Sequence, residues 1–199
     1  MPNINWKREI FTIPNLLSLF RLALIPVYIV MYLNAVTPLD HYLSAGILTL
    51  SCLTDMFDGM IARKFNMISN IGKILDPLAD KLTQFTLALC LAIKNGNLWL
   101  WLVIALLIVK EFYQLIALAV SIRKGRVLKG ALMSGKICTT ILFVSLVSLV
   151  MFYTMPPLAV DIIAIVDILF LLYAFIDYII AYCRKDRNFE SVEDATNLS

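Results

Sequence analysis

The chain has 199 residues, of which 61% are hydrophobic and 16% are charged. Soluble domains are about half apolar and about a quarter charged, so this composition excludes a soluble globular protein and a disordered chain. The net charge of +3 is too small to attract nucleic acid, and we expect no nucleic-acid partner. The composition is typical of a polytopic membrane protein.

Six apolar segments follow one another, each about as long as a membrane-crossing helix. They cover residues 17–36, 42–62, 75–94, 97–121, 137–154 and 158–182. The alternation typical of a membrane barrel is absent, so we predict an all-α fold with six transmembrane helices. Residues 3–12 mix apolar and charged side chains, which favours a short N-terminal interfacial helix. We expect residues 1–183 to form a single membrane domain and residues 184–199 a polar cytoplasmic tail.

Basic residues gather in the N-terminal segment, the second and fourth links and the tail. They include Lys7, Arg8, Arg63, Lys64, Arg123, Arg126, Lys129, Lys136, Arg184 and Lys185. The alternate links at residues 37–41 and 155–157 contain no Lys or Arg. Because cytoplasmic loops carry an excess of Lys and Arg, both termini are predicted to be cytoplasmic, in a protein of the cell (inner) membrane.

Four aspartates lie at the predicted cytoplasmic junction of the second and third spans. At ~100° per residue, Asp55 and Asp58 share one helix face, and Asp76 and Asp80 share another. Carboxylates converging near a membrane cannot all stay ionised without cations, and ionisable groups in spans are costly. Hard divalent ions prefer oxygen ligands, so the cluster predicts Mg²⁺ or Mn²⁺ whose coordination is completed by substrate phosphates.

Small and basic residues follow the first two acids. Gly59 and Ala62 leave room for a bulky ligand near the helix backbone, and Arg63 offers a cation to an anion. Small residues also serve close helix packing in membranes, and that interpretation stays open for Gly59 and Ala62. Packing alone does not explain four acids together.

The acids belong to a longer pattern, D-x2-D-G-x2-A-R-x8-G-x3-D-x3-D. Its fixed positions are Asp55, Asp58, Gly59, Ala62, Arg63, Gly72, Asp76 and Asp80. This pattern resembles the signature of the CDP-alcohol phosphatidyltransferases. Residues 13–18 with Arg21, and residues 70–73 before Asp76, are most similar to the bacterial phosphatidylglycerophosphate synthase branch of that family.

In this family a CDP-activated lipid donates its phosphatidyl group to an alcohol and releases CMP. The resemblance implies that Asp55, Asp58, Asp76 and Asp80 bind two divalent ions and that Asp80 is also the general base. It further implies donor binding by Asn15, Ser18, Gly59, Ala62, Arg63, Ser69 and Gly72. Arg21 either contacts the donor, CDP-diacylglycerol, or pairs with one of the acids. Family members are commonly homodimers, so a homodimer in the lipid bilayer is expected.

Glycerol 3-phosphate is the acceptor that the resemblance favours, and its dianion calls for basic groups. The candidates are Lys110, Arg123, Arg126, Lys129 and Lys136. The synthases usually have a second Lys and a second Arg nearby, where this chain has Cys138 and Leu118. For Asp177 near the end of the last span, we favour a hydrogen bond or ion pair, with Lys136 or Lys110, over metal binding.

Three alternatives stay open. Phosphatidylglycerol as acceptor, giving cardiolipin, would need fewer basic groups. A divalent-cation transporter would use the same acids, but residues 43–53 contain few polar groups to continue a path across the membrane. A non-catalytic scaffold would tolerate replacement of Asp80.

Overall fold

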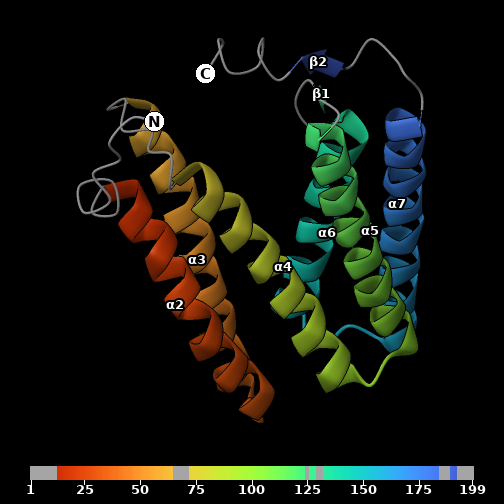
Figure 1. Ribbon diagram of the computed structural model, residues 1–199. Helices are drawn as coiled ribbons and strands as arrows, with labels where there is room; N and C mark the ends of the chain where they lie inside the picture. The colour runs from red at the N-terminus through yellow and green to blue at the C-terminus, as the bar shows by residue number, and fades with distance from the viewer. Residues whose placement is uncertain (1–12, 65–71, 124–125, 129–131, 184–188, 192–199) are drawn as a thin grey trace. The chain divides into compact units, whose positions relative to one another are not determined.

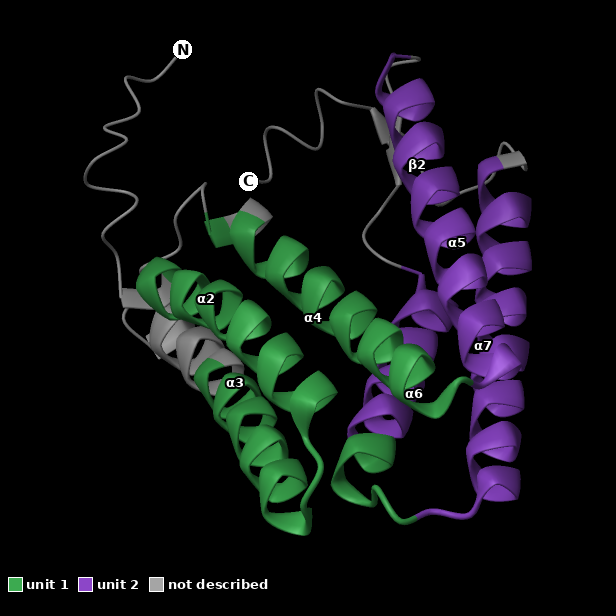
Figure 2. Cartoon of the chain, turned by 90° about the horizontal axis from the view of Figure 1, so that it is seen from below, with its two compact units in different colours: residues 1–96, 148–154 green, residues 97–147, 155–199 purple. Residues whose placement is uncertain are grey.

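The computed structural model of the protein describes residues 13–64, 72–123, 126–128, 132–183 and 189–191. These residues form six helices, α2 to α7, and one sheet of two short strands (Figure 1). The elements divide between two compact units (Figure 2). The all-α prediction is therefore confirmed for the described residues, apart from the two short strands.

Unit 1 consists of Met1–Gly96 and Ser148–Thr154. It contains α2 (Ile13–Asn34), α3 (Pro38–Lys64) and α4 (Gly72–Asn95). Helix α2 packs against both α3 and α4 and lies between them (Figure 2).

Unit 2 consists of Asn97–Val147 and Met155–Ser199. It contains α5 (Leu98–Arg123), nearly all of α6 (Met133–Met151), and α7 (Pro157–Cys183). Helix α5 packs along α7.

The two strands join the α5–α6 connection to the tail. Strand β1 (Arg126–Leu128) pairs antiparallel with β2 (Phe189–Ser191), and Val127 lies opposite Glu190. Part of the predicted polar tail is therefore held to unit 2 by main-chain hydrogen bonds.

A reciprocal set of hydrogen bonds starts α3. The Asp40 carboxylate accepts hydrogen bonds from the backbone N–H groups of Thr37 at 2.8 Å and Val36 at 3.1 Å. The Asp40 N–H donates to the Thr37 hydroxyl at 3.3 Å. These bonds, foremost that from the Thr37 backbone, lower the pKa of Asp40. Thr37 and Asp40 thus form a helix cap, and Pro38 occupies the first helical position, where its missing N–H costs nothing.

The end of α4 holds the end of α2. Gly96 has φ 59° and its N–H donates to the carbonyl of Ala92 at 3.0 Å, which terminates α4. Just before it, the Lys94 ammonium donates to the carbonyls of Tyr32 and Ala35, both at 2.8 Å. These carbonyls lie at the C-terminal end of α2, where the helix dipole is negative. The Lys94 ammonium therefore supplies hydrogen bonds to carbonyls that lack partners within the helix, and its positive charge interacts favourably with the dipole.

Polarity is inverted along the first part of α2. Leu16, Leu19 and Phe20 are 40% to 46% exposed, whereas Asn15, Ser18 and Arg21 are at most 2% exposed. A helix that turns apolar side chains outward and polar ones inward is stable where the surrounding medium is lipid.

Four of the described helical segments are long and apolar enough to cross a membrane. They are Asn15–Asn34, Leu98–Arg123, Met133–Met151 and Pro157–Tyr182. Within the described residues, α3 and α4 do not meet that criterion, and these helices carry the acidic signature. The structure supports an integral membrane protein, while residues 3–12, predicted as an interfacial helix, lie outside the described part.

Candidate active site

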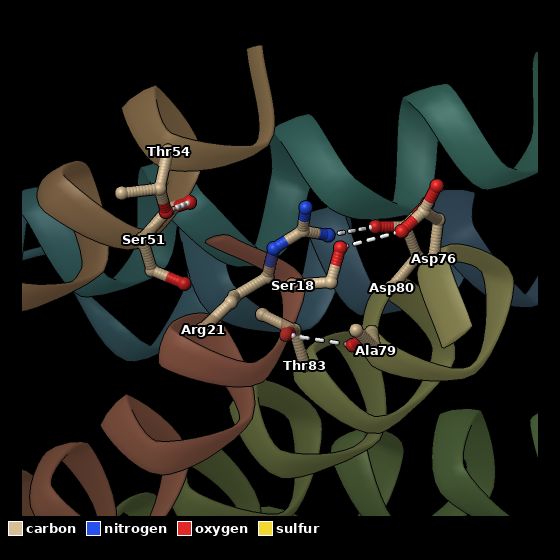
Figure 3. Close-up of polar contacts among 8 residues, drawn as sticks. All are labelled: Ser18, Arg21, Ser51, Thr54, Asp76, Ala79, Asp80 and Thr83. Atoms are coloured by element: carbon tan, nitrogen blue, oxygen red, sulfur yellow. Dashed lines mark hydrogen bonds and ion pairs between the residues drawn. The ribbon is translucent and has the colours of Figure 1, made fainter. Parts of the chain in front are cut away.

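Two polar contacts join α2 to α4. The Ser18 hydroxyl donates to Oδ1 of Asp76 at 2.5 Å, and the Arg21 guanidinium forms an ion pair with Oδ1 of Asp80 (Figure 3). Ser18 and Arg21 are three residues apart and share a face of α2, and Asp76 and Asp80 are four apart and share a face of α4. The first donor of α2 therefore contacts the first carboxylate of α4, and the second donor contacts the second carboxylate.

The Arg21–Asp80 pair is asymmetric in its exposure. The Arg21 side chain is 3% exposed and the Asp80 side chain is 53% exposed. A buried guanidinium needs a counter-charge, and Asp80 supplies it. Arg21 thus pairs with an acid, which is one of the two roles considered for it. The exposed carboxylate still reaches the surface of the unit, where a substrate can approach it.

Two further predicted donor-binding residues lie at this end of unit 1. Asn15 is 1% exposed and lies one turn before Ser18 on the same face of α2. Gly72 is buried and begins α4, four residues before Asp76.

The α3 contribution is described up to Thr54. Ser51 and Thr54 are buried, and the Thr54 hydroxyl donates to the Ser51 carbonyl at 2.7 Å. The backbone of α3 passes through Asp55, Asp58, Gly59, Ala62 and Arg63, but the side chains of these residues lie outside the described part of the structure, as does all of Ser69.

The chemistry of the described carboxylates suits a hard cation. Asp76 and Asp80 offer oxygen donors on one face of α4, which is the ligand type that Mg²⁺ and Mn²⁺ prefer. Among the described side chains, no three His, Cys, Asp or Glu residues are grouped as a metal site. A complete site would therefore need Asp55 and Asp58 as well.

Sequence reasoning missed the hydroxyl groups near these contacts. Thr83 is 8% exposed and its hydroxyl donates to the Ala79 carbonyl at 2.8 Å (Figure 3). It follows Asp76 by seven residues and Asp80 by three, so it lies on the same face of α4. Helical spacing from the acids was the signal that would have found it.

The basic candidates for acceptor binding belong to unit 2. Lys110 is 2% exposed and its ammonium donates to Oε1 of Glu111 at 2.8 Å. Arg123 is exposed at the end of α5, about 20 Å from Lys110 along the helix axis. Lys136 is exposed near the start of α6. The structure therefore does not bring Lys110 and Arg123 together.

The predicted hydrogen-bonding role of Asp177 is confirmed, with a different partner. Its Oδ2 accepts a hydrogen bond from the Ser134 hydroxyl. Lys110, one of the two partners considered, pairs with Glu111 instead.

The inverted polarity and the carboxylates held between α2 and α4 define an α-helical membrane protein with an acidic centre at one end of its helices. The chain matches the model of the CDP-alcohol phosphatidyltransferase family over residues 11–178. The protein therefore belongs to this family, as the signature indicated.

Curated relatives narrow the comparison. The chain is 49% identical over 71 residues to the CDP-diacylglycerol--glycerol-3-phosphate 3-phosphatidyltransferase of Rickettsia bellii, covering 35% of this chain and 38% of that protein. It is 35% identical over 113 residues to the protein of the same name from Bacillus subtilis, covering 51% of this chain and 58% of that protein.

A third relative has a different name. The chain is 41% identical over 91 residues to a "Cardiolipin synthase (CMP-forming) / mitochondrial hydrolase fusion protein" of Schizosaccharomyces pombe, covering 45% of this chain and 14% of that protein. The matches with the two bacterial relatives span 38% and 58% of their lengths, or about half.

Proposed function

We propose that the protein transfers the phosphatidyl group of CDP-diacylglycerol to glycerol 3-phosphate, giving phosphatidylglycerophosphate and CMP. The family match and the names of the bacterial relatives support this reaction. The observation that carries the proposal is the pair of signature carboxylates, Asp76 and Asp80, held on one face of α4 by donors from α2.

The carboxylates of the signature fit a divalent metal centre. Asp55, Asp58, Asp76 and Asp80 would hold two ions, Mg²⁺ or Mn²⁺. Bound there, the ions would neutralise the pyrophosphate of the donor and the charge on departing CMP. The donor-binding residues are Asn15, Ser18, Gly59, Ala62, Arg63, Ser69 and Gly72.

Asp80 is the general base. It accepts the proton of the acceptor hydroxyl while that oxygen bonds to the phosphatidyl phosphorus, and the bond from phosphorus to the bridging oxygen breaks to release CMP. Arg21 contacts Oδ1 of Asp80. The exposure of Asp80 favours this role, because a base must reach the substrate. Arg21 and Ser18 orient the two carboxylates.

The acceptor phosphate binds basic residues, for which the candidates are Lys110, Arg123 and Lys136. The distance along α5 prevents one phosphate from contacting both Lys110 and Arg123. The Lys110 ammonium is engaged by Glu111, whereas Lys136 is exposed. Lys136 is therefore the first residue to test.

The reaction takes place at the cytoplasmic face of the cell (inner) membrane. We place six spans in the lipid bilayer, a short interfacial helix at residues 3–12, and both termini in the cytoplasm. Residues 1–183 act as one membrane domain, followed by the polar tail of residues 184–199, and the protein works as a homodimer. The four apolar helical segments support a protein that crosses the membrane several times, and the distribution of basic residues supports the cytoplasmic location of both termini.

An acceptor panel tests the reaction. The purified full chain in detergent micelles receives CDP-diacylglycerol and Mg²⁺ with glycerol 3-phosphate or phosphatidylglycerol, and CMP release is measured. We expect release with glycerol 3-phosphate and its loss on chelation of the metal. Release with phosphatidylglycerol alone would favour the cardiolipin alternative, which the Schizosaccharomyces pombe relative and the residues Cys138 and Leu118 support. No release with either acceptor would contradict the proposed reactions.

A further inference from the structure

The start of α6 is bound to the end of α7 within unit 2. The Ser134 hydroxyl donates to Oδ2 of Asp177. Ser134 is 6% exposed and is the second residue of α6. This contact therefore attaches the first turn of α6 to the last turns of α7, at the predicted cytoplasmic ends of both helices.

The next residue makes a close approach that requires glycine. A Cβ atom at Gly135 would lie 2.6 Å from Oη and 2.9 Å from Cε2 of Tyr178. Tyr178 is 8% exposed, and its ring stacks on that of Tyr182 with 6.5 Å between centroids. Tyr182 in turn packs edge-on against Tyr113 at 6.4 Å. Because neighbouring rings support Tyr178, it cannot withdraw easily from a larger side chain.

Lys136 directly follows the two residues that make these contacts. Ser134 and Gly135 face α7, and Cys138, one turn after Ser134, is 1% exposed. Lys136 lies between these inward positions in sequence but is exposed, as expected for a residue rotated by ~100° per step around the helix.

The backbone at Lys136 is also held locally. Its N–H donates to the Leu132 carbonyl at 3.2 Å, and its carbonyl accepts hydrogen bonds from the hydroxyls of Thr139 at 3.0 Å and Thr140 at 2.9 Å. The rotation of this turn, and with it the direction of Lys136, is set by its own hydrogen bonds and by α7.

We infer that Ser134, Gly135, Asp177 and Tyr178 form an α6–α7 lock, whose function is to position Lys136 for the phosphate of the acceptor. These are positioning residues, because they act through Lys136. The inference rests on the proposed function, in which Lys136 binds that phosphate. The lock lies outside the acidic signature and determines the affinity for the acceptor. It does not affect the affinity for the donor or the rate of phosphoryl transfer.

Gly135→Ala tests the lock directly. The added methyl group would clash with the Tyr178 ring and displace either that ring or this turn of α6. We therefore expect the KM for the acceptor to rise about tenfold, with kcat and the KM for CDP-diacylglycerol nearly unchanged. Gly46→Ala is the matched control, because a Cβ at Gly46 meets nothing within 4 Å. Adding Tyr178→Phe to Gly135→Ala removes the nearest atom and should restore part of the acceptor affinity.

Variants of the Ser134–Asp177 hydrogen bond test the lock independently, also if Gly135→Ala does not fold. Ser134→Ala and Asp177→Ala each remove the hydrogen bond and should raise the acceptor KM. Asp177→Asn keeps an oxygen that accepts from Ser134, so its acceptor KM should stay near that of the unmodified protein. Equal effects of Asp177→Asn and Asp177→Ala would overturn the hydrogen-bond part of the lock.

Lys136→Ala separates failure of the lock from failure of the proposed function. If Lys136→Ala raises the acceptor KM but the Gly135 and Asp177 variants leave it unchanged, the lock is wrong and the proposed acceptor site stands. If Lys136→Ala has no effect on the acceptor KM, the acceptor site is wrong and the lock loses its stated function. A parallel rise in the KM for CDP-diacylglycerol in Gly135→Ala would also overturn the inference.

Discussion

The two units satisfy buried positive charge in different ways. In unit 1, Arg21 pairs with Asp80, which lies 59 residues away on another helix. In unit 2, Lys110 pairs with Glu111, its neighbour on the same helix. The first pair ties two helices together and fixes where the carboxylate of the proposed base lies. The second pair lies within α5, so this contact ties no second helix to α5.

The buried acid of unit 2 sharpens the contrast. Asp167 is 1% exposed, and among the described residues neither of its carboxylate oxygens meets the geometry of a hydrogen bond. Asp76 and Asp80, in contrast, each accept a hydrogen bond from α2. We therefore expect substitutions in unit 1 to affect the reaction more than stability, and substitutions at the buried charges of unit 2 to do the reverse.

Replacing the proposed base should have the largest effect. Asp80→Asn keeps the shape of the side chain and a hydrogen-bond acceptor for Arg21, but it cannot take a proton from the acceptor. We expect CMP release to fall by about 1000-fold or more, with the protein still folded. Asp161→Asn, which changes a carboxylate near the start of α7, serves as the control and should keep turnover within about twofold. Substantial turnover by Asp80→Asn would remove Asp80 from the role of base.

Removing the cation that contacts Asp80 should cause the second-largest loss of turnover. Arg21→Leu leaves the carboxylate without its ion-pair partner, and we expect turnover to fall by about 10- to 100-fold. The free energy of unfolding should fall by about 1 kcal/mol, because Asp80 is 53% exposed and water screens the pair. Arg21→Lys keeps the charge without the planar guanidinium and should give an intermediate rate. Unchanged kinetics in Arg21→Leu would show that the α2–α4 contact does not orient the base.

The local pair of unit 2 should respond differently to single and double replacement. Lys110→Met removes the buried ammonium that pairs with Glu111 and should destabilise the protein by about 2 kcal/mol. Lys110→Met with Glu111→Leu removes both charges and should bring stability back to within about 1 kcal/mol of the unmodified protein. The acceptor KM should rise about tenfold in both if Lys110 contacts the phosphate. Denaturation in detergent and acceptor titrations measure the two effects.

The smallest effect on turnover is expected at Asp167. Asp167→Asn removes a charge that has no hydrogen-bonded partner among the described residues, so it should raise Tm by about 2 °C and leave turnover within about twofold. Thermal unfolding followed by tryptophan fluorescence gives the shift. Loss of CMP release in a folded Asp167→Asn protein would mean that Asp167 takes part in the reaction.

Hydropathy predicted most of the helices but not their ends. The apolar run at residues 97–121 corresponds closely to α5 at Leu98–Arg123. The run at residues 137–154 begins four residues later than α6 at Met133–Met151, because Ser134 and its neighbours are small or polar. The hydrogen bond from Ser134 to Asp177 holds this first turn of α6 to α7, and hydropathy does not register such a contact.

The sequence predicts those features of the candidate site that depend only on residue spacing within one helix. The shared face of Asp76 and Asp80 follows from their separation of four residues. The sequence left two roles open for Arg21, because the choice depends on how α2 packs against α4. Spacing places Thr83 on the same face of α4 as the acids, but the sequence does not show that this face meets α2.

The pairing of β1 with β2 has a practical consequence for making the protein. A truncation after residue 183 would look harmless from composition, because it removes a polar end. It would in fact delete β2 and expose the unpaired edge of β1 in the connection that leads to Ser134 and Lys136. Expression vectors should therefore keep residues 189–191, and a C-terminal affinity tag should follow a spacer long enough to leave that strand in its register.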